Sequence, residues 1–279
     1  MFSLNLGFMQ GRLSPLVNGK IQAFPWKFWQ DEFFLANQIE LHLMEWTLDQ
    51  ENLHSNPLLT AEGRKEILGL SRKFNLNIPS LTGDCFMQEP FWKAEGEKRK
   101  KLENDFFNIV NASSEIGIKF IVVPLVDNGA IENHIQNEIL ISFLESLIPS
   151  LDELDIKILF ESDFAPDQLK KFISQFNLNY FGINYDIGNS ASLGYNPIDE
   201  FSAYGQNILN IHIKDRLLSG STVPLGQGNA NFEKVFKLLN QVNYKGNFIF
   251  QTARAKDEDH IGLMKTYINK IQNIYRNLI

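Results

Sequence analysis

The distribution of short apolar runs constrains the fold of this chain more than any other feature. Eight runs rich in apolar or β-branched residues recur, at residues 4–9, 39–46, 77–83, 119–124, 157–162, 180–186, 208–215 and 247–252. Most intervals between them carry apolar residues at helical spacing, as between the fourth and fifth runs, with Ile135, Ile139, Phe143, Leu147 and Leu151. Strands that alternate with helices form parallel sheets, either open or closed, and the count of eight favours a closed (β/α)8 barrel.

A single domain is expected over residues 1–279. Barrels of this class commonly fold as one domain of about 250 residues, and no long Pro-, Gly- or Ser-rich linker divides this sequence. After the eighth run, apolar residues step by three and four and predict a helix that seals the ring; they are Ile261, Met264, Ile268, Ile271, Ile274 and Leu278. We therefore predict an α/β protein that consists of one (β/α)8 TIM barrel.

The charge pattern argues against nucleic-acid and membrane partners. The formal net charge is −7, and lysine and arginine are scattered rather than gathered in a basic stripe. No apolar run approaches the ~20 residues that span a bilayer, and the N-terminal sequence has no basic region followed by an apolar stretch. Because Cys85 is the only cysteine, no internal disulfide can form. These features predict a cytoplasmic protein and leave its oligomeric state open, a homo-oligomer included.

Four neighbouring strands in the second half end in residues that can bind a metal ion. These residues are Glu161, Asp186, His212 and Gln251. In a (β/α)8 barrel the carboxyl ends of the strands meet at one mouth, so these side chains are expected to converge there. Two carboxylates, an imidazole and a carboxamide form a mixed oxygen and nitrogen set that suits Mn²⁺, Mg²⁺, Co²⁺ or Zn²⁺. One divalent ion would also offset the repulsion between the carboxylates.

The segments at these strand ends resemble the xylose isomerase-like (β/α)8 superfamily of sugar and sugar-phosphate isomerases and epimerases. The resemblance spans the chain and depends on the order of several segments, namely "GFMQGRLSP", "LMEWTLD", "LFESD", "NYDIGNSASLGYNP", "HIKDR", "VPLGQGNANF" and "FIFQTAR". It implies a small-molecule carbohydrate substrate and one divalent metal, held by an acidic residue of strand five, an aspartate of strand six, a histidine of strand seven and an acidic residue of strand eight. The first three correspond here to Glu161, Asp186 and His212.

Strand eight departs from this family pattern because it ends in Gln251. A carboxamide oxygen can bind a hard cation, but it cannot take up a proton. The resemblance implies two carboxylates on opposite faces of the substrate, one that removes a proton beside the carbonyl and one that returns it. Glu161 is predicted to remove the proton, while Glu45, Asp84 and Lys214 are the groups available to return it. We predict Glu161, Lys214 and Glu45 as catalytic residues.

Several polar residues near the strand ends are predicted to bind the substrate. They are Arg12, Asn189, Asp215, Arg216 and Arg254. In "NYDIGNSASLGYNP", Gly188 is expected to let the backbone turn after Asp186. Gly226 and Gly228 are able to bring backbone N–H groups near an anion, although a tight turn before the next helix explains the pattern equally well. A sugar phosphate is favoured slightly over a free sugar.

Three other functions are weighed against an isomerase or epimerase. A dehydratase or lyase acting on a keto-sugar or an inosose-like substrate needs one base and an acid for the leaving hydroxyl, so Gln251 is compatible with it. A catalytically silent sugar-binding barrel is also compatible with Gln251, but it does not explain why Glu161, Asp186, His212 and Lys214 occur together. A nuclease with several zinc ions requires more strand-end histidines than this chain has, since Asn189 stands at the histidine position of a D-x-x-H pattern.

Overall fold

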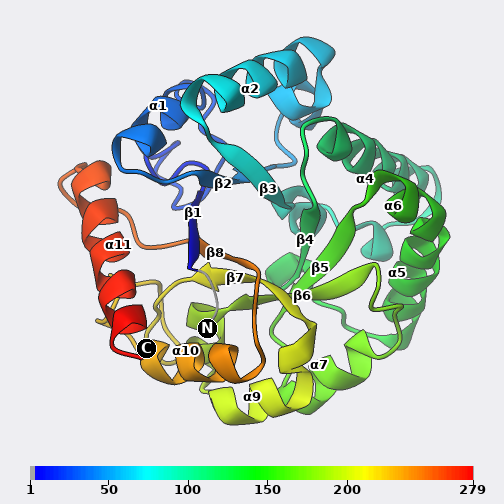
Figure 1. Ribbon diagram of the computed structural model, residues 1–279. Coiled ribbons are helices and arrows are strands. Elements are labelled where there is room, and N and C mark those ends of the chain that lie inside the picture. Colours follow the sequence, from blue (N-terminus) through cyan, green and yellow to red (C-terminus); the bar gives the residue numbers. More distant parts are fainter. Residues whose placement is uncertain (1–3, 279) are drawn as a thin grey trace.

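In the computed structural model, which describes residues 4–278, eight parallel strands close into a barrel in chain order (Figure 1). The strands are β1 (Asn5–Met9), β2 (Leu43–Thr47), β3 (Asn77–Thr82), β4 (Phe120–Leu125), β5 (Lys157–Ser162), β6 (Phe181–Asp186), β7 (Ile208–Ile213) and β8 (Asn247–Phe250). Pairing of β1 with β8 completes the ring. The predicted (β/α)8 fold is thus confirmed. The described residues do not include Ile279 or residues 1–3. Residues 1–3 belong to the N-terminal segment in which no leader was expected.

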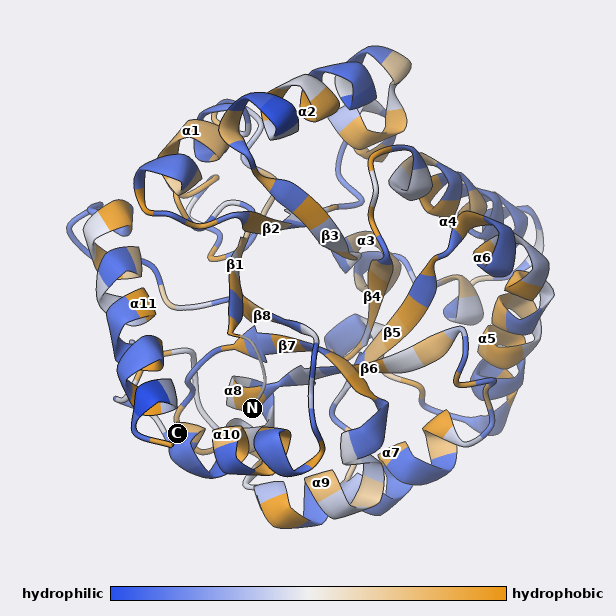
Figure 2. Cartoon of the chain, viewed as in Figure 1, coloured by the Kyte–Doolittle hydropathy of each residue, from blue (hydrophilic) through white to orange (hydrophobic). Residues whose placement is uncertain are grey.

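Helices surround this barrel on its outer side (Figure 1). Along residues 4–278 the helices are α1 (Asp31–Gln38), α2 (Ala61–Phe74), α3 (Asp84–Gln88), α4 (Gly96–Glu115), α5 (His134–Ser146), α6 (Ile148–Leu154), α7 (Pro166–Ile173), α8 (Ile187–Leu193), α9 (Pro197–Tyr204), α10 (Phe232–Gln241) and α11 (His260–Arg276). The short helices α3 and α8 lie inside the outer ring (Figure 2). Short 3₁₀ turns add η1 (Leu53–Ser55), η2 (Pro57–Leu59), η3 (Phe91–Lys93), η4 (Asp127–Gly129) and η5 (Gly205–Asn207). Apolar and polar residues alternate along the outer helices (Figure 2). Within residues 4–278, no helix has both the length and the apolar composition needed to cross a membrane.

The structure changes two details of the predicted elements. The single helix expected between the fourth and fifth strands is split into α5 and α6 at Leu147, and Pro149 lies in the first turn of the second helix. Ile135, expected on the buried face, is 68% exposed. The second strand begins at Leu43 rather than at residue 39, because the chain first leaves α1 through a turn in which Glu40 has a φ of 57°.

Alternation along β6 and β7 directs one set of side chains toward the outer helices and another, polar set into the barrel. On the outer side of β6, the Tyr185 hydroxyl donates to Glu200 of α9 over 2.8 Å. On the inner side, Asn184 hydrogen bonds to Glu161 of β5 and accepts from Asn210 of β7. Successive side chains of a strand point to opposite faces, so residues two apart lie on the same side. The polar inner residues are therefore stacked toward the carboxyl ends of the strands.

Candidate functional site

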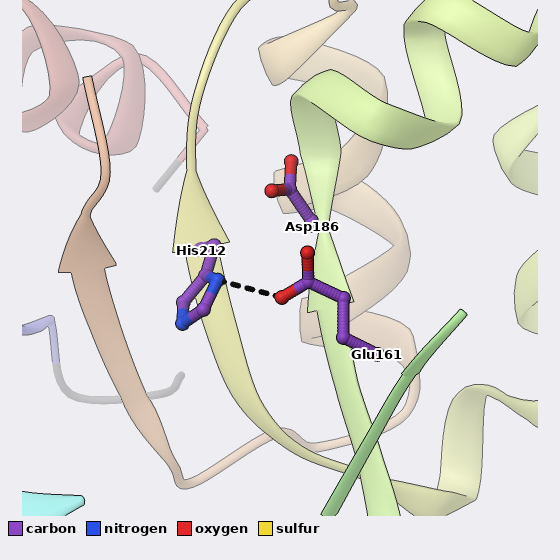
Figure 3. Close-up of side chains that lie close together, drawn as sticks. All are labelled: Glu161, Asp186 and His212. Atoms are coloured by element: carbon purple, nitrogen blue, oxygen red, sulfur yellow. Dashed lines mark ion pairs between the residues drawn. The ribbon is translucent and has the colours of Figure 1, made fainter. Parts of the chain in front are cut away.

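Three buried side chains from neighbouring strands converge at the carboxyl end of the barrel (Figure 3). They are Glu161 of β5, Asp186 of β6 and His212 of β7, and each offers one donor atom within 4.8 Å of the other two. Nδ1 of His212 lies 3.0 Å from Oε2 of Glu161, which is the ion pair drawn in the figure. The convergence predicted from the strand ends is therefore present in the structure.

Below these residues, Glu45 of β2 binds the other nitrogen of the histidine. Oε1 of Glu45 lies 2.7 Å from Nε2 of His212, and both side chains are fully buried. Oε2 of Glu45 accepts hydrogen bonds from Ser80 over 2.7 Å and from Asn210 over 3.0 Å. Burial alone would lower the pKa of His212, but the charges and hydrogen bonds of Glu45 and Glu161 raise this pKa to about 10.

Two asparagines that the sequence analysis did not single out complete this buried network. Asn184 donates to Oε2 of Glu161 over 2.8 Å, and its own oxygen accepts from Asn210 over 2.8 Å. Each lies two residues before a predicted ligand on the same strand, so strand alternation is the signal that could have identified them. We call Glu45, Ser80, Asn184, Asn210 and His212 the lower level of the mouth.

Above this level, Lys214 lies among three oxygens. Its Nζ donates to Oδ2 of Asp186 over 3.0 Å, to Oδ1 of Asn189 over 3.2 Å and to Oε1 of Gln251 over 3.1 Å. The lysine stem passes close over Gly188, where an added Cβ would lie 2.7 Å from Cγ of Lys214. Gly188 is therefore needed for this close approach, and not for the turn expected from the sequence, because it lies within α8.

Asn189 links the two sides of the site. Its Nδ2 donates to Oε1 of Glu161 over 2.9 Å, while its Oδ1 accepts from Nη1 of Arg216 over 2.9 Å as well as from Lys214. Its backbone N–H donates to Oδ1 of Asp186, which caps the start of α8. The carboxylates of β5 and β6 are thus held by the first turn of α8, which follows β6 directly.

Gln22, from the long loop between β1 and α1, spans the top of the site. Its Nε2 donates to Oδ2 of Asp84 over 2.5 Å, and its Oε1 accepts from Nε2 of Gln251 over 2.8 Å and from Nη2 of Arg12 over 3.0 Å. No pattern in the sequence pointed to Gln22, because it lies in a loop without regular spacing. We call Gln22, Asp84, Asn189, Lys214, Arg216 and Gln251 the upper level.

The upper level lines a cavity of about 580 Å³ at the mouth. Four carboxyl groups also lie on its wall, those of Asp84, Asp127, Glu161 and Asp163. Glu45 is not among the lining residues, and its carboxylate is instead occupied by the lower level. A cavity of this size and polarity suits a small polar molecule.

Asp84 is the first residue of α3 and is only 6% exposed. Burial raises its pKa to about 7, the hydrogen bond from Gln22 opposes this, and the charges of Asp49 and Glu161 add to it. A carboxyl group in this range exchanges a proton readily near neutral pH.

Asp215, which was predicted to contact the substrate, does not line the mouth cavity. Its carboxylate is fully buried and accepts hydrogen bonds from the backbone N–H groups of Gly226, Gly228 and Ala230, over 2.7, 3.0 and 3.0 Å. The glycine N–H groups that were considered for an anionic substrate are therefore directed at a side chain of the protein itself. Asp215 shapes the loop after β7 instead of facing the cavity.

Arg12 and Arg254 also hold the chain rather than lining the mouth cavity. Arg12 is 4% exposed and donates to the carbonyl of Ile21 and to Gln22, and burial together with Arg254 lowers its pKa to about 9. Arg254 donates to the carbonyls of Gly11 and Ser14. Both guanidinium groups thus fix the loop after β1, which carries Gln22.

The donor set fits a single metal ion. Because Glu45 engages Nε2 of His212, Nδ1 is left facing Glu161, and a carboxylate that binds the second nitrogen is the usual way in which a metal-binding histidine is oriented. Gln251 is linked to Asp186 through Lys214, which donates to an oxygen of each. Three donors are therefore arranged for an ion, and the oxygen of the predicted fourth, Gln251, accepts from Lys214.

Comparison with known proteins identifies the same architecture. Residues 33–269 match the family model described as "Xylose isomerase-like TIM barrel". A protein of Haemophilus influenzae, provisionally named L-ribulose-5-phosphate 3-epimerase SgbU, is 25% identical over 252 residues, which cover 83% of this chain and 86% of the relative. An inosose dehydratase of Clostridium beijerinckii is 24% identical over 208 residues, which cover 62% of this chain and 67% of that enzyme.

One solved structure extends the comparison to three dimensions. The IolI protein, crystallised with a bound zinc atom, superposes with a TM-score of 0.75 at 15% sequence identity and covers 97% of this chain and 99% of its own. At this level of identity, the likeness shows the fold alone.

Proposed function

The chain belongs to the family of xylose isomerase-like TIM barrels, and on this premise we propose that it interconverts sugars or sugar phosphates by moving a proton at a carbon beside a carbonyl group. The observation that carries the proposal is Glu161, a buried carboxylate on the wall of a polar cavity at the carboxyl ends of the strands. The epimerase name of the Haemophilus relative supports an epimerisation of this kind.

Glu161 is the proposed base. Its Oε1 accepts from Asn189 and its Oε2 from Asn184, so the carboxylate is held in one orientation while it lines the cavity. A positioned base of this type contributes about 10²–10⁴-fold to the rate.

A divalent ion would be held by Glu161, Asp186 and His212, with the oxygen of Gln251 as a fourth ligand. Such an ion supplies Lewis-acid stabilisation of the negative charge that develops on the substrate oxygens. Mn²⁺, Mg²⁺, Co²⁺ and Zn²⁺ all accept this donor set. The zinc atom in the related fold of IolI supports the proposal.

Lys214 and Arg216 are proposed to face the oxygens of the substrate. Both line the cavity and both carry a positive charge close to Glu161, through their shared contact with Asn189. Glu45 is assigned a positioning role, because it orients His212 from below and does not line the cavity. The substrate is a small carbohydrate; its phosphorylation, the cytoplasmic location and a homo-oligomeric assembly remain predictions.

A dehydratase is the second candidate function. The Clostridium relative is named inosose dehydratase, and a dehydration needs one base to form the enediolate and an acid to release the hydroxyl. Gln251 does not obstruct such a reaction, because no second carboxylate is required at strand eight.

Proton exchange tests the proposed function. The purified protein with added Mn²⁺ is incubated in D₂O with ketoses, ketose phosphates and inosose-like ketones, and replacement of C–H by C–D is followed by NMR. We expect exchange that EDTA abolishes; for the epimer whose proton faces Glu161, Glu161→Gln should reduce this exchange by about 10³-fold. Glu153→Gln, on the exposed side of α6, is the matched control.

The product separates the candidate reactions. Inversion of one stereocentre identifies an epimerase, formation of an aldose from a ketose identifies an isomerase, and loss of water identifies a dehydratase. If wild-type protein exchanges no proton of any of these compounds, the proposed function is wrong. Titration of the protein with Mn²⁺ by calorimetry measures metal binding independently of turnover, and His212→Ala should abolish it.

A further inference from the structure

We propose that Asp84 is the second proton-transfer group of the mouth, the one that returns a proton to the carbon from which Glu161 removes it. The inference rests on the proposed function and supplies a residue that this function lacks. Gln251 stands where the family resemblance implies a second carboxylate, and a carboxamide does not act as a general acid or base near neutral pH. Another acid must therefore reach the same cavity.

Burial distinguishes Asp84 from the other carboxyl groups of the cavity. Asp127 and Asp163 line the cavity too, but both are exposed to solvent. Asp84 is 6% exposed, as is Glu161. These two are therefore the buried carboxyl groups on the wall of the mouth cavity among residues 4–278. Glu45 is excluded because it lies outside the lining and its oxygens are occupied by Ser80, Asn210 and His212.

Lys214 is the other group that could return a proton, and its contacts argue for a different role. Its ammonium donates to three oxygens, those of Asp186, Asn189 and Gln251. An ammonium has three protons, so each has an acceptor. Transfer of one of them to a substrate would break a hydrogen bond that holds the site together.

The hydrogen bond from Gln22 fixes how Asp84 presents its carboxyl group. Oε1 of Gln22 accepts from both Arg12 and Gln251, so its amide nitrogen must be the atom that faces Asp84. Oδ2 of Asp84 is therefore an acceptor. Oδ1 takes part in none of the hydrogen bonds found among residues 4–278, so it is the oxygen left to carry a proton.

The electrostatic surroundings support the same role. Asp49 from the loop after β2 and Glu161 from β5 face Asp84 with negative charge, while Arg12 from the loop after β1 opposes them. Together with burial, these charges place the pKa of Asp84 at about 7. The carboxyl group is therefore present in both protonation states near neutral pH, as a group that gives and takes a proton requires.

The proposed step balances. The Glu161 carboxylate removes the proton from the carbon beside the carbonyl, and the C–H electron pair forms the enediolate. The Asp84 carboxylic acid then gives its proton to the same carbon from another side, and the carbonyl is restored. Glu161 is left protonated and Asp84 ionised, and exchange of protons with water returns both to their starting forms. The opposite epimer reacts through the same groups in reverse order.

Exchange measured separately for the two epimers tests Asp84. With Asp84→Asn, epimerisation should fall by about 10³-fold, while the epimer whose proton faces Glu161 still exchanges that proton in D₂O at a rate within about tenfold of wild type. Glu161→Gln should give the converse pattern, with exchange retained only in the other epimer. Asp167→Asn, at an exposed position of α7, is the matched control.

Gln22→Met provides a second test that leaves both carboxyl groups in place. The Gln22 hydrogen bond lowers the pKa of Asp84, so its removal should raise this pKa. In the direction in which Asp84 donates, the fall of the rate at high pH should therefore move to higher pH. A role of Asp84 in folding alone would leave the position of this limb unchanged.

Two results would overturn the inference and leave the proposed function standing. One is full epimerisation by a folded Asp84→Asn variant. The other is equal loss of exchange in both epimers, which would show that Asp84 positions the site without transferring a proton. If wild-type protein exchanges no substrate proton at all, the proposed function fails and the inference fails with it.

Discussion

The lower and upper levels of the mouth use similar polar side chains in opposite ways. In the lower level, Glu45 and His212 are fully buried and bind each other and the strands around them. In the upper level, Asp84, Lys214 and Arg216 line the cavity, and each has a partner in a loop: Gln22, Gln251 and the carbonyl of Gly220, respectively.

This difference indicates that the lower level mainly stabilises the fold and that the upper level mainly serves catalysis. A buried charge that loses its partner is costly, because the low-dielectric interior cannot replace the lost interaction. Substitutions in the lower level should therefore lower the free energy of unfolding, and they should affect catalysis only by changing how the site residues are oriented. The upper level meets the cavity, so its residues should affect chemistry first. Four predictions test this division.

The largest effect is expected for His212→Ala. The substitution leaves Glu45 and Glu161 without the cation between them, so the free energy of unfolding should fall by about 3–5 kcal/mol at pH 7. His260→Ala is the matched control, since this buried histidine has no carboxylate partner among its described hydrogen bonds and ion pairs and should cost about 1 kcal/mol. If urea denaturation gives the same loss of unfolding free energy for His212→Ala and His260→Ala, the lower level has no special role in stability.

Asp84→Asn should increase the free energy of unfolding as the pH rises, in contrast to His212→Ala. Because the folded pKa of about 7 lies above the ordinary 3.8, the wild-type stability contribution is present below about pH 4 and is lost as the pH rises through 7. Asparagine carries no ionisable proton, so the variant should gain about 2–4 kcal/mol relative to wild type between pH 4 and pH 8. Urea denaturation of both proteins at several pH values measures this. A difference that does not change with pH would contradict the raised pKa.

Asp215→Asn separates folding from substrate binding. The carboxylate accepts three backbone N–H groups of the loop after β7, and the amide accepts fewer of them, so unfolding should become easier by about 1–3 kcal/mol. The KM should stay within about twofold of the wild-type value, because the side chain does not reach the cavity. A large rise in KM without a change in Tm would return Asp215 to the binding residues.

Gln251→Glu is expected to have the smallest effect. A carboxylate added beside Asp186 and Glu161 should raise the affinity for Mn²⁺ about tenfold, or about 1.4 kcal/mol. The gain is limited because Lys214 would form an ion pair with the new group. Calorimetric titration measures the change, with Gln241→Glu on the surface of α10 as the control. Unchanged affinity would show that strand eight lies outside the metal set.

Strand periodicity made the fold and part of the site predictable. Glu161, Asp186 and His212 lie on or at the ends of strands whose apolar pattern is clear, so their inward direction follows from alternation. The same rule applied two residues earlier would have identified Asn184 and Asn210. These positions could be anticipated because a barrel strand leaves few alternatives.

Loop residues were not predictable to the same extent. Gln22 reaches Asp84 across residues distant in sequence, and no local pattern encodes such a contact. Asp215 was assigned to the substrate because its position near a glycine-rich loop suits both roles; only the loop geometry shows that its carboxylate takes the backbone N–H groups itself. Arg12 and Arg254 were assigned to the substrate for a similar reason, since an arginine near a strand end can bind carbonyls as well as a ligand, and both bind backbone carbonyls in the structure.

The hydrogen bond between Gln22 and Asp84 makes a symmetric group unsymmetric. The two oxygens of a free carboxyl group are equivalent, and rotation in water exchanges them. At Asp84 the amide nitrogen of Gln22 donates to one oxygen, Oδ2. Hydrogen bonds from Arg12 and Gln251 to the amide oxygen of Gln22 prevent a flip of this amide. Any proton that Asp84 carries is thereby confined to one oxygen before a ligand arrives. The asymmetry of the site therefore includes the position of this one proton.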